Sequence, residues 1–99
     1  MVKHIILWTL KEELSESEKE KVKKGIQEGL EGLKGKIPGM TDIQVRIEKL
    51  ASSNVDVMLD SSFESEEALK GYSVHPEHVK VKQYIHKVLV NGISVDFED

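Results

Sequence analysis

The segment 2–10, VKHIILWTL, is apolar on both sides if the chain is extended there. It is rich in β-branched and aromatic residues, which favour strands. Successive side chains of a strand point to opposite faces, so Ile6 and Trp8 lie on one face while Ile5 and Leu7 lie on the other. A strand with two apolar faces has to be covered on both sides. The fold of this chain must therefore bury its first strand from above and from below.

A helix is predicted to begin after this strand. Ser15 and Glu18 have the spacing of a capping box, in which each residue satisfies a backbone N–H of the other. Apolar side chains then recur every three or four residues, as on one face of a helix. They are Val22, Ile26, Leu30, Leu33 and Ile37. The pattern predicts that the helix ends at Gly35 and the pair Pro38-Gly39.

Three glycines interrupt this predicted helix: Gly25, Gly29 and Gly32. Each weakens a helix by about 1 kcal/mol relative to alanine. Tertiary packing must therefore hold the helix, and the missing side chains leave space beside it. The space could serve a close contact between the helix and the sheet, or it could hold a ligand.

The rest of the chain is predicted as strand, strand, helix, helix and strand. The segments are 42–50, 55–63, 64–72, 75–87 and 88–97. The two strands that come first alternate apolar and polar residues, as half-buried strands do. Pro76 suits the first position of a helix, and Asn91-Gly92 indicates a bulge in the last strand.

The order of these elements predicts an α+β fold of the ferredoxin-like βαββαβ type, a four-stranded sheet with its helices on one face. Ninety-nine residues make one domain, 1–99. The helix-free face of the sheet still carries the apolar residues of the first strand. A second copy of the chain is the simplest cover for this face, so we expect a homodimer with two-fold symmetry.

The composition argues against several kinds of partner. The chain has 14 Lys and Arg against 18 Asp and Glu, a net charge of −4, and no basic cluster for nucleic acid. It has no cysteine, which suits a reducing compartment. Only seven residues separate Lys3 from Lys11, too few for a signal peptide or a membrane span. We expect a cytoplasmic protein without nucleic-acid or membrane partners.

The segment 71–87, GYSVHPEHVKVKQYIHK, holds three of the four histidines. Pro76 favours an extended conformation for His75 and starts a helix behind it. His78 then falls in the first turn, where the positive end of the helix dipole disfavours its protonated form. A neutral imidazole can accept a proton, so His78 is a candidate general base, with the hydroxyl of Tyr72 nearby.

The expected faces of the last helix suggest which side chains meet. His78 shares a face with Val81 and Ile85, which points it inward, whereas Lys82 and His86 lie closer to solvent with His75. His4 lies on the inward face of the first strand. The side chains that we expect to line one interior volume are His4, Ile6, Trp8, Leu59, Tyr72, His78, Val81 and Ile85. Tyr72 and His78 could form an acid/base pair there, or they could be hydrogen-bonded core residues, as could His4.

A metal site is the alternative use of the histidines. His75 and His78 are three residues apart and could supply two ligands. However, Pro76 breaks the helical register between them, so the two rings point in different directions. We expect no metal site and no cofactor.

Four short stretches resemble one known family. They are VKHIILW at the start, FES before the short helix, YSVHPEH, and VDFE at the end. Together they are similar to the stress-responsive A/B barrel (Dabb) family over the whole chain. The resemblance implies that two ferredoxin-like subunits pack sheet on sheet into a dimeric α/β barrel.

Most members of this family have no assigned activity, and some plant members respond to stress. One plant member is a polyketide cyclase that performs an aldol-type condensation without a cofactor. Its catalytic tyrosine and histidine match Tyr72 and His78, and a histidine that lines its pocket matches His4. Where the cyclase has a further histidine this chain has Val57, and where it has pocket aromatics this chain has Val22 and Ile26. The resemblance thus implies a related pocket of different shape.

Two functions remain open from the sequence. One is cofactor-free acid/base catalysis on an apolar carbonyl compound, with Tyr72 and His78 catalytic. The expected ligand-binding residues are His4, Ile6, Trp8, Leu59, His75, Val81 and Ile85. The other is a non-catalytic structural or ligand-carrying dimer. An oxygen-using monooxygenase of a related barrel is a weaker alternative, because those families share the fold without the histidine block.

Overall fold

The order of strands and helices matches the predicted order. The computed structural model describes residues 1–99. Its elements are β1 (Val2–Leu10), α1 (Glu16–Glu31), β2 (Met40–Arg46), β3 (Val57–Phe63), α2 (Glu66–Val74), α3 (Pro76–Val88) and β4 (Leu89–Glu98). Pro76 occupies the first turn of α3, as predicted. None of the three helices is long and apolar enough to cross a membrane.

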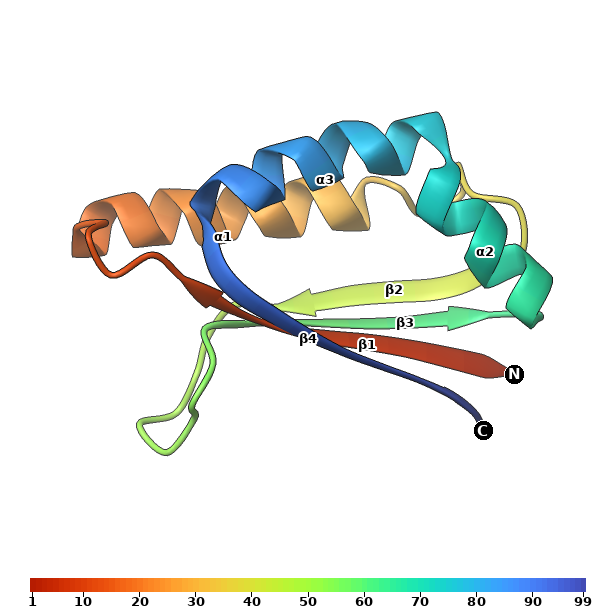
Figure 1. Cartoon of the computed structure of the whole chain (residues 1–99), viewed down its shortest axis with the longest axis horizontal. Coiled ribbons are helices and arrows are strands. Elements are labelled where there is room, and N and C mark those ends of the chain that lie inside the picture. The colour runs from red at the N-terminus through yellow and green to blue at the C-terminus, as the bar shows by residue number, and fades with distance from the viewer.

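The four strands form one antiparallel sheet in the order β2-β3-β1-β4. All three helices lie on the same face of this sheet, and the opposite face carries no helix (Figure 1). The predicted ferredoxin-like α+β fold is confirmed. Because β1 lies between β3 and β4, its inward side chains face the helices at the centre of the molecule.

The start of α1 is as the sequence predicted. Ser15 Oγ accepts a hydrogen bond from the backbone N–H of Glu18, and the carboxylate of Glu18 accepts one from the backbone N–H of Ser15. The capping box therefore fixes this helix end with two reciprocal bonds.

The predicted end of α1 is wrong. The helix stops at Glu31 with Gly32 as its cap, before Gly35. Leu33 and Ile37 are nevertheless buried in the turns that follow. Their spacing correctly predicted that these side chains face the core. The turns that follow the helix keep them on the core side although the helix has ended.

Two glycines of α1 allow close contact with α3. A Cβ atom on Gly29 would lie 3.1 Å from Cγ1 of Val81, and one on Gly25 would lie 2.8 Å from the hydroxyl of Tyr84. The space that these glycines leave is thus filled by a neighbouring helix, whereas the sequence suggested the sheet or a ligand.

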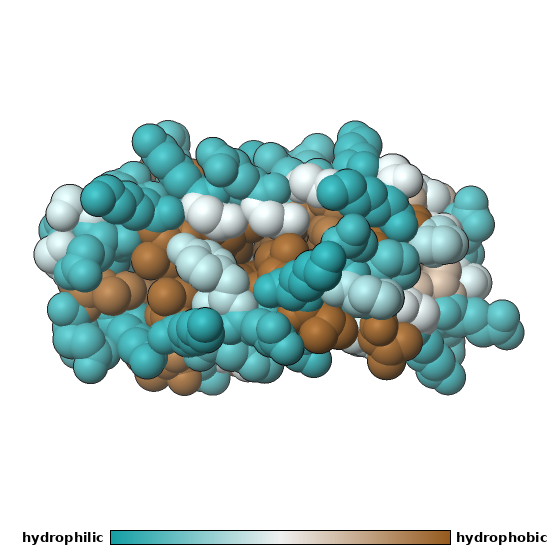
Figure 2. Space-filling view, turned by 90° about the horizontal axis from the view of Figure 1, so that it is seen from above, coloured by the Kyte–Doolittle hydropathy of each residue, from teal (hydrophilic) through white to brown (hydrophobic).

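Figure 2 shows the helix side of the molecule, where apolar surface in the middle is surrounded by polar side chains.

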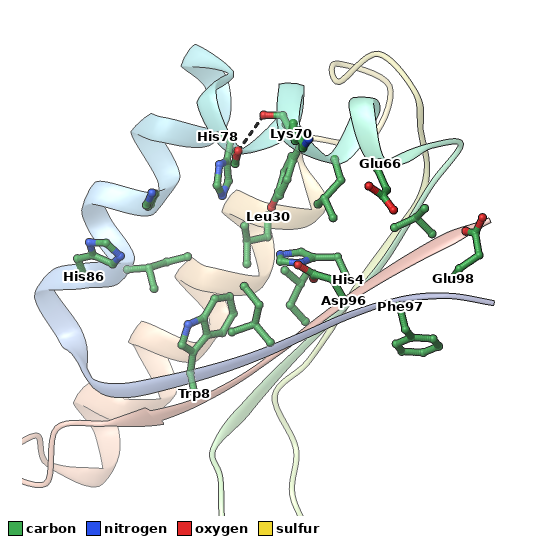
Figure 3. A pocket seen from close by; sticks show the side chains of 18 residues that line it. His4, Trp8, Leu30, Glu66, Lys70, His78, His86, Asp96, Phe97 and Glu98 are labelled. Carbon is green, nitrogen blue, oxygen red and sulfur yellow. Dashed lines mark hydrogen bonds and ion pairs between the residues drawn. The ribbon is translucent and has the colours of Figure 1, made fainter.

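The helix-free face of the sheet carries an apolar strip, which we call the open sheet face. Cross-strand pairs place Ile5 beside Val95 and Leu7 beside Ile93. Ile93 and Val95 are 59% and 52% exposed, although both are large apolar residues. The other apolar members of the face are Met58, opposite Leu7, and Phe97, which points away from the helices in Figure 3. The second apolar face of β1 is therefore left uncovered in one subunit.

Strand β4 contains the predicted irregularity, one residue earlier than expected. The pairing passes from Thr9–Asn91 to Leu10–Leu89, so Val90 has no partner and forms a bulge. Gly92 lies opposite Trp8, and a Cβ on Gly92 would come within 2.9 Å of the indole. The glycine therefore leaves room for the indole beside β4.

Candidate functional site

A cavity of about 620 Å³ lies between the helix layer and the sheet. Strand β1 supplies one wall, and α2 and α3 supply the opposite wall (Figure 3). The structure brings together most of the side chains that the sequence singled out. Those that line the cavity are His4, Ile6, Trp8, Leu59, Tyr72, His78 and Ile85.

Two of the predicted site residues lie elsewhere. His75 joins the two helices, because its backbone N–H donates to the carbonyl of Tyr72 and its Nδ1 accepts from the backbone N–H of Glu77. Val81 packs against Gly29 of α1. His75 thus caps α3, and Val81 belongs to the contact between α1 and α3.

The rings of Tyr72 and His78 stack at the wall of the cavity. Their centroids are 4.0 Å apart and their planes are inclined by 30°. The hydroxyl of Tyr72 and Nδ1 of His78 are both buried, and neither has a hydrogen-bond partner. An unpartnered buried polar atom costs about 1–3 kcal/mol. Two such atoms in contacting residues are unusual in a core and are consistent with a site that a ligand or water completes.

The surroundings of this pair set the protonation of both residues. Burial lowers the pKa of His78, and the positive charges of Lys82 and His4 act in the same direction. The backbone of Ser73 and Tyr72 near the ring opposes this shift of the His78 pKa without cancelling it, although neither residue forms a hydrogen bond of good geometry with Nδ1. Burial raises the pKa of Tyr72 far above its ordinary value. At neutral pH the site therefore pairs a neutral imidazole, which can accept a proton, with a protonated phenol, which can donate a hydrogen bond.

His4 completes the aromatic cluster at the base of the cavity. Its ring meets that of Tyr72 edge-on, with centroids 6.0 Å apart. On its other side, Nδ1 of His4 contacts the carboxylate of Asp96, its cross-strand partner on β4. His4 is thus both a satisfied core residue and a wall of the cavity. Asp96 is 92 residues away from His4 in the sequence. Only the pairing of the first and last strands could have indicated this contact.

Charged residues at the cavity were also missed. Lys82 and His86 line it and are also exposed to solvent, as the sequence predicted. Their spacing of four and eight residues from His78 was the available signal for a place at the cavity, because such residues share a helix face. The other charged residues of the lining are Glu66, Lys70 and Glu98. No group of three or more His, Asp or Glu side chains is arranged to hold a metal ion.

Comparison with known proteins identifies the family. The sequence model of the stress responsive A/B barrel domain matches residues 2–99. The chain belongs to this family. The resemblance inferred from the four short stretches is therefore confirmed, whereas no curated protein matches the sequence of this Dabb chain.

Solved structures share the fold over nearly the full length. A dimeric protein of unknown function from Bacteroides fragilis is 30% identical, with a TM-score of 0.93 over 99% of this chain and 95% of that one. A protein of Arabidopsis thaliana is 24% identical, with a TM-score of 0.76 over 100% and 95% of the two chains. A Dabb family protein of Mesorhizobium loti is 20% identical, with a TM-score of 0.74 over 99% and 95%. These similarities establish the ferredoxin-like fold and assign no reaction.

Proposed function

We propose that this Dabb protein is a homodimer in which each subunit binds a small, largely apolar carbonyl compound and acts on it by cofactor-free acid/base catalysis. In this proposal His78 is the general base and Tyr72 is the hydrogen-bond donor. The observation that carries the proposal is the stacked pair with its two unpartnered polar atoms at the cavity wall.

The reaction that these two groups suit is enolisation. The neutral imidazole of His78 removes a proton from the carbon beside a carbonyl, and the electron pair of that C–H bond moves to form an enolate. The phenol of Tyr72 donates a hydrogen bond to the enolate oxygen, where negative charge develops. The enolate then takes back a proton or attacks a second carbonyl carbon. Neither outcome needs an oxidant, a reductant or a metal.

The rest of the cavity supports an apolar ligand. Ile6, Trp8, Leu59 and Ile85 form apolar walls. The volume of about 620 Å³ falls within the range of roughly 300–1,000 Å³ that is usual for small-molecule sites. Apolar walls also exclude water, which strengthens the hydrogen bond to a developing enolate.

A ligand-carrying protein without turnover is the second candidate. It is favoured by the burial of Tyr72, whose side chain is only 1% exposed. A hydroxyl sealed in this way reaches a ligand only after a local adjustment. In the carrier, the Tyr72 and His78 rings would support the cavity wall and would not react.

The open sheet face supports the dimer. Its exposed residues Ile93 and Val95 alternate along β4 with Asp96, which lines the cavity, so they point to the other side of the sheet. A related protein from Bacteroides fragilis is dimeric. Packing of two such faces would cover the second side of β1, which the monomer leaves open. The two sheets would then form the barrel that gives the family its name.

The test of catalysis is solvent exchange of an aryl ketone. Acetophenone in D₂O is incubated with the protein, and the loss of its methyl proton signal is followed by NMR. Catalysis predicts faster exchange with the wild-type chain and loss of the acceleration in His78→Asn, with Glu12→Gln, an exposed loop substitution, as the unchanged control. Binding of the ketone without acceleration of exchange supports the carrier, and absence of binding refutes both functions.

A further inference from the structure

One wall of the cavity carries a row of basic side chains. His78, Lys82 and His86 follow one another at four-residue intervals on α3, and all three line the cavity. Residues four apart lie on the same face of a helix, about 6 Å apart along its axis. The helix thus places an imidazole, an ammonium group and a second imidazole along one cavity, with Lys82 and His86 on its solvent-exposed side.

This row has no acidic partner in the protein. Neither Lys82 nor His86 forms an ion pair, whereas the nearby Lys80 lies 3.5 Å from the carboxylate of Glu77 on the same helix. A cationic group that lines a cavity and lacks a partner is free to bind an anion there. The charge of Lys82 already acts inside the cavity, because it contributes to the lowered pKa of His78.

The acidic residues of the lining lie apart from this row or are already engaged. Figure 3 shows His86 at one end of the cavity and Glu66 and Glu98 at the other. The carboxylate of Asp96 contacts His4, and that of Glu98 lies 3.6 Å from the amino group of Met1.

The remaining basic side chain of the lining is Lys70. It forms no ion pair either, but it follows Glu66 by one turn of α2, so a carboxylate stands on the same helix face, which Lys82 lacks. The end of the cavity formed by α3 therefore carries the ammonium group of Lys82 with no carboxylate paired to it.

We propose that the ligand of this cavity is a keto acid, whose carboxylate binds Lys82 and His86 while its carbonyl lies at Tyr72 and His78. This inference rests on the proposed function and narrows its substrate class. The spacing of His78 and Lys82 along α3 sets the distance between the carbonyl and the nearer contact of the carboxylate at about 6 Å. Ile85 and Trp8 are the apolar surfaces for the carbon skeleton between them.

The probe compounds are 4-acetylbenzoate and its neutral analogue 4-acetylbenzamide. Both place an acetyl group across an aromatic ring from the second group, and they differ only in charge. The reporter is the indole N–H resonance of Trp8, because this is the only tryptophan in the chain and it lines the cavity. Titrations at low ionic strength give the dissociation constant of each compound for the full-length dimer.

We expect the wild-type protein to bind the carboxylate about 5-fold or more tightly than the amide. Lys82→Gln removes this preference and leaves the affinity for the amide unchanged, whereas Lys82→Arg keeps the preference. Lys80→Gln is the matched control: it makes the same change of charge on the same helix, at a side chain outside the cavity lining, and it keeps the preference.

The outcomes separate the two proposals. Equal affinities for the two compounds, or a preference that survives Lys82→Gln, overturn the keto-acid inference and leave the carbonyl-binding cavity intact. If neither compound shifts the Trp8 resonance at any concentration, the cavity does not bind aryl ketones, and the proposed function and the inference are both refuted.

Discussion

The ring of Tyr72, in the last turn of α2, stacks on the ring of His78, in the first turn of α3, with 4.0 Å between their centroids. The joint between the two helices makes this contact possible. His75 accepts a hydrogen bond from the N–H of Glu77, and Pro76 starts the next helix immediately. The chain thus changes direction within a few residues, and the imidazole of His78 comes to lie on the ring of the tyrosine. Of the histidines near Pro76, His75 caps the helix at the bend and His78 forms the stack that the bend allows.

The lowered pKa of His78 predicts how stability depends on pH. The unfolded chain takes up this proton near the ordinary pKa of 6.5, and the folded chain does so only at lower pH. Between the two pKa values the unfolded state binds more protons, so the free energy of unfolding decreases as the pH falls below about 6.5. Urea denaturation over a pH series should show this decrease in the wild type and a smaller one in His78→Asn. A larger decrease in His78→Asn would contradict the assignment.

Tyr72→Phe should affect stability and activity in opposite directions. The substitution removes a buried hydroxyl that has no partner and keeps the stack on His78, so we expect the free energy of unfolding to stay the same or to rise by about 1 kcal/mol. If the phenol donates to the enolate, exchange of the ketone slows by roughly 10²-fold or more. A clear loss of stability would show that water or another group satisfies the hydroxyl in solution. Tyr72→Leu, which removes the ring as well, is the destabilised comparison.

A charge on the open sheet face should break the dimer. Val95→Lys places an ammonium group beside Ile5 in the middle of this face, where it would be buried without a partner in the dimer. Sedimentation equilibrium should give the wild type about twice the mass of the 11.2 kDa chain and the variant the mass of one chain. Val74→Lys is the matched control, because Val74 is 74% exposed on α2, on the helix side. A wild-type protein that is a folded monomer at micromolar concentration would disprove the dimer.

The contact between α1 and α3 predicts a coupled pair of substitutions. Gly25→Ala should gain about 1 kcal/mol of helix propensity, but its Cβ would lie 2.8 Å from the hydroxyl of Tyr84. In the Tyr84→Phe background the contact with the hydroxyl is gone and the nearest atom is Cζ of the ring at 3.3 Å, so the alanine should be more stabilising there than in the wild type. The double-mutant cycle, measured by thermal or urea unfolding, should give a coupling of at least about 0.5 kcal/mol. Additive effects would mean that Tyr84 moves aside without cost.

Much of the fold could be predicted because its signals are local. The capping box of Ser15 and Glu18 and the helix start at Pro76 each depend on a few neighbouring residues. The division of the apolar residues of 2–10 between two faces likewise depends only on the pleat of a strand. These signals keep their meaning whatever the rest of the chain does. They were sufficient for the order of the elements, for the side of the sheet that the helices cover, and for the grouping of His4 with Tyr72 and His78.

The predictions that failed concern how elements meet. Leu33 and Ile37 are buried as the helical spacing required, but the turns after Glu31 bury them. Val81 was expected in the cavity, but it packs against Gly29 of α1. Lys82 was expected near solvent and is exposed, but it also lines the cavity, which was not expected. A helical wheel gives only the directions of side chains relative to one another. A small error in the expected rotation of α3 about its axis therefore exchanges residues that line the cavity with residues that contact α1.

The sequence by itself determined the elements, their order, the candidate acid and base residues around Pro76 and an apolar strand that needs a cover on both faces. The tertiary structure alone decided which groups act together. Gly25 and Gly29 let α3 approach α1, and this contact turns His78, Lys82 and His86 toward one cavity. The pairing of β1 with β4 brings Asp96 to His4 across the length of the chain. Both depend on contacts between residues far apart in sequence, and no local pattern encodes such contacts.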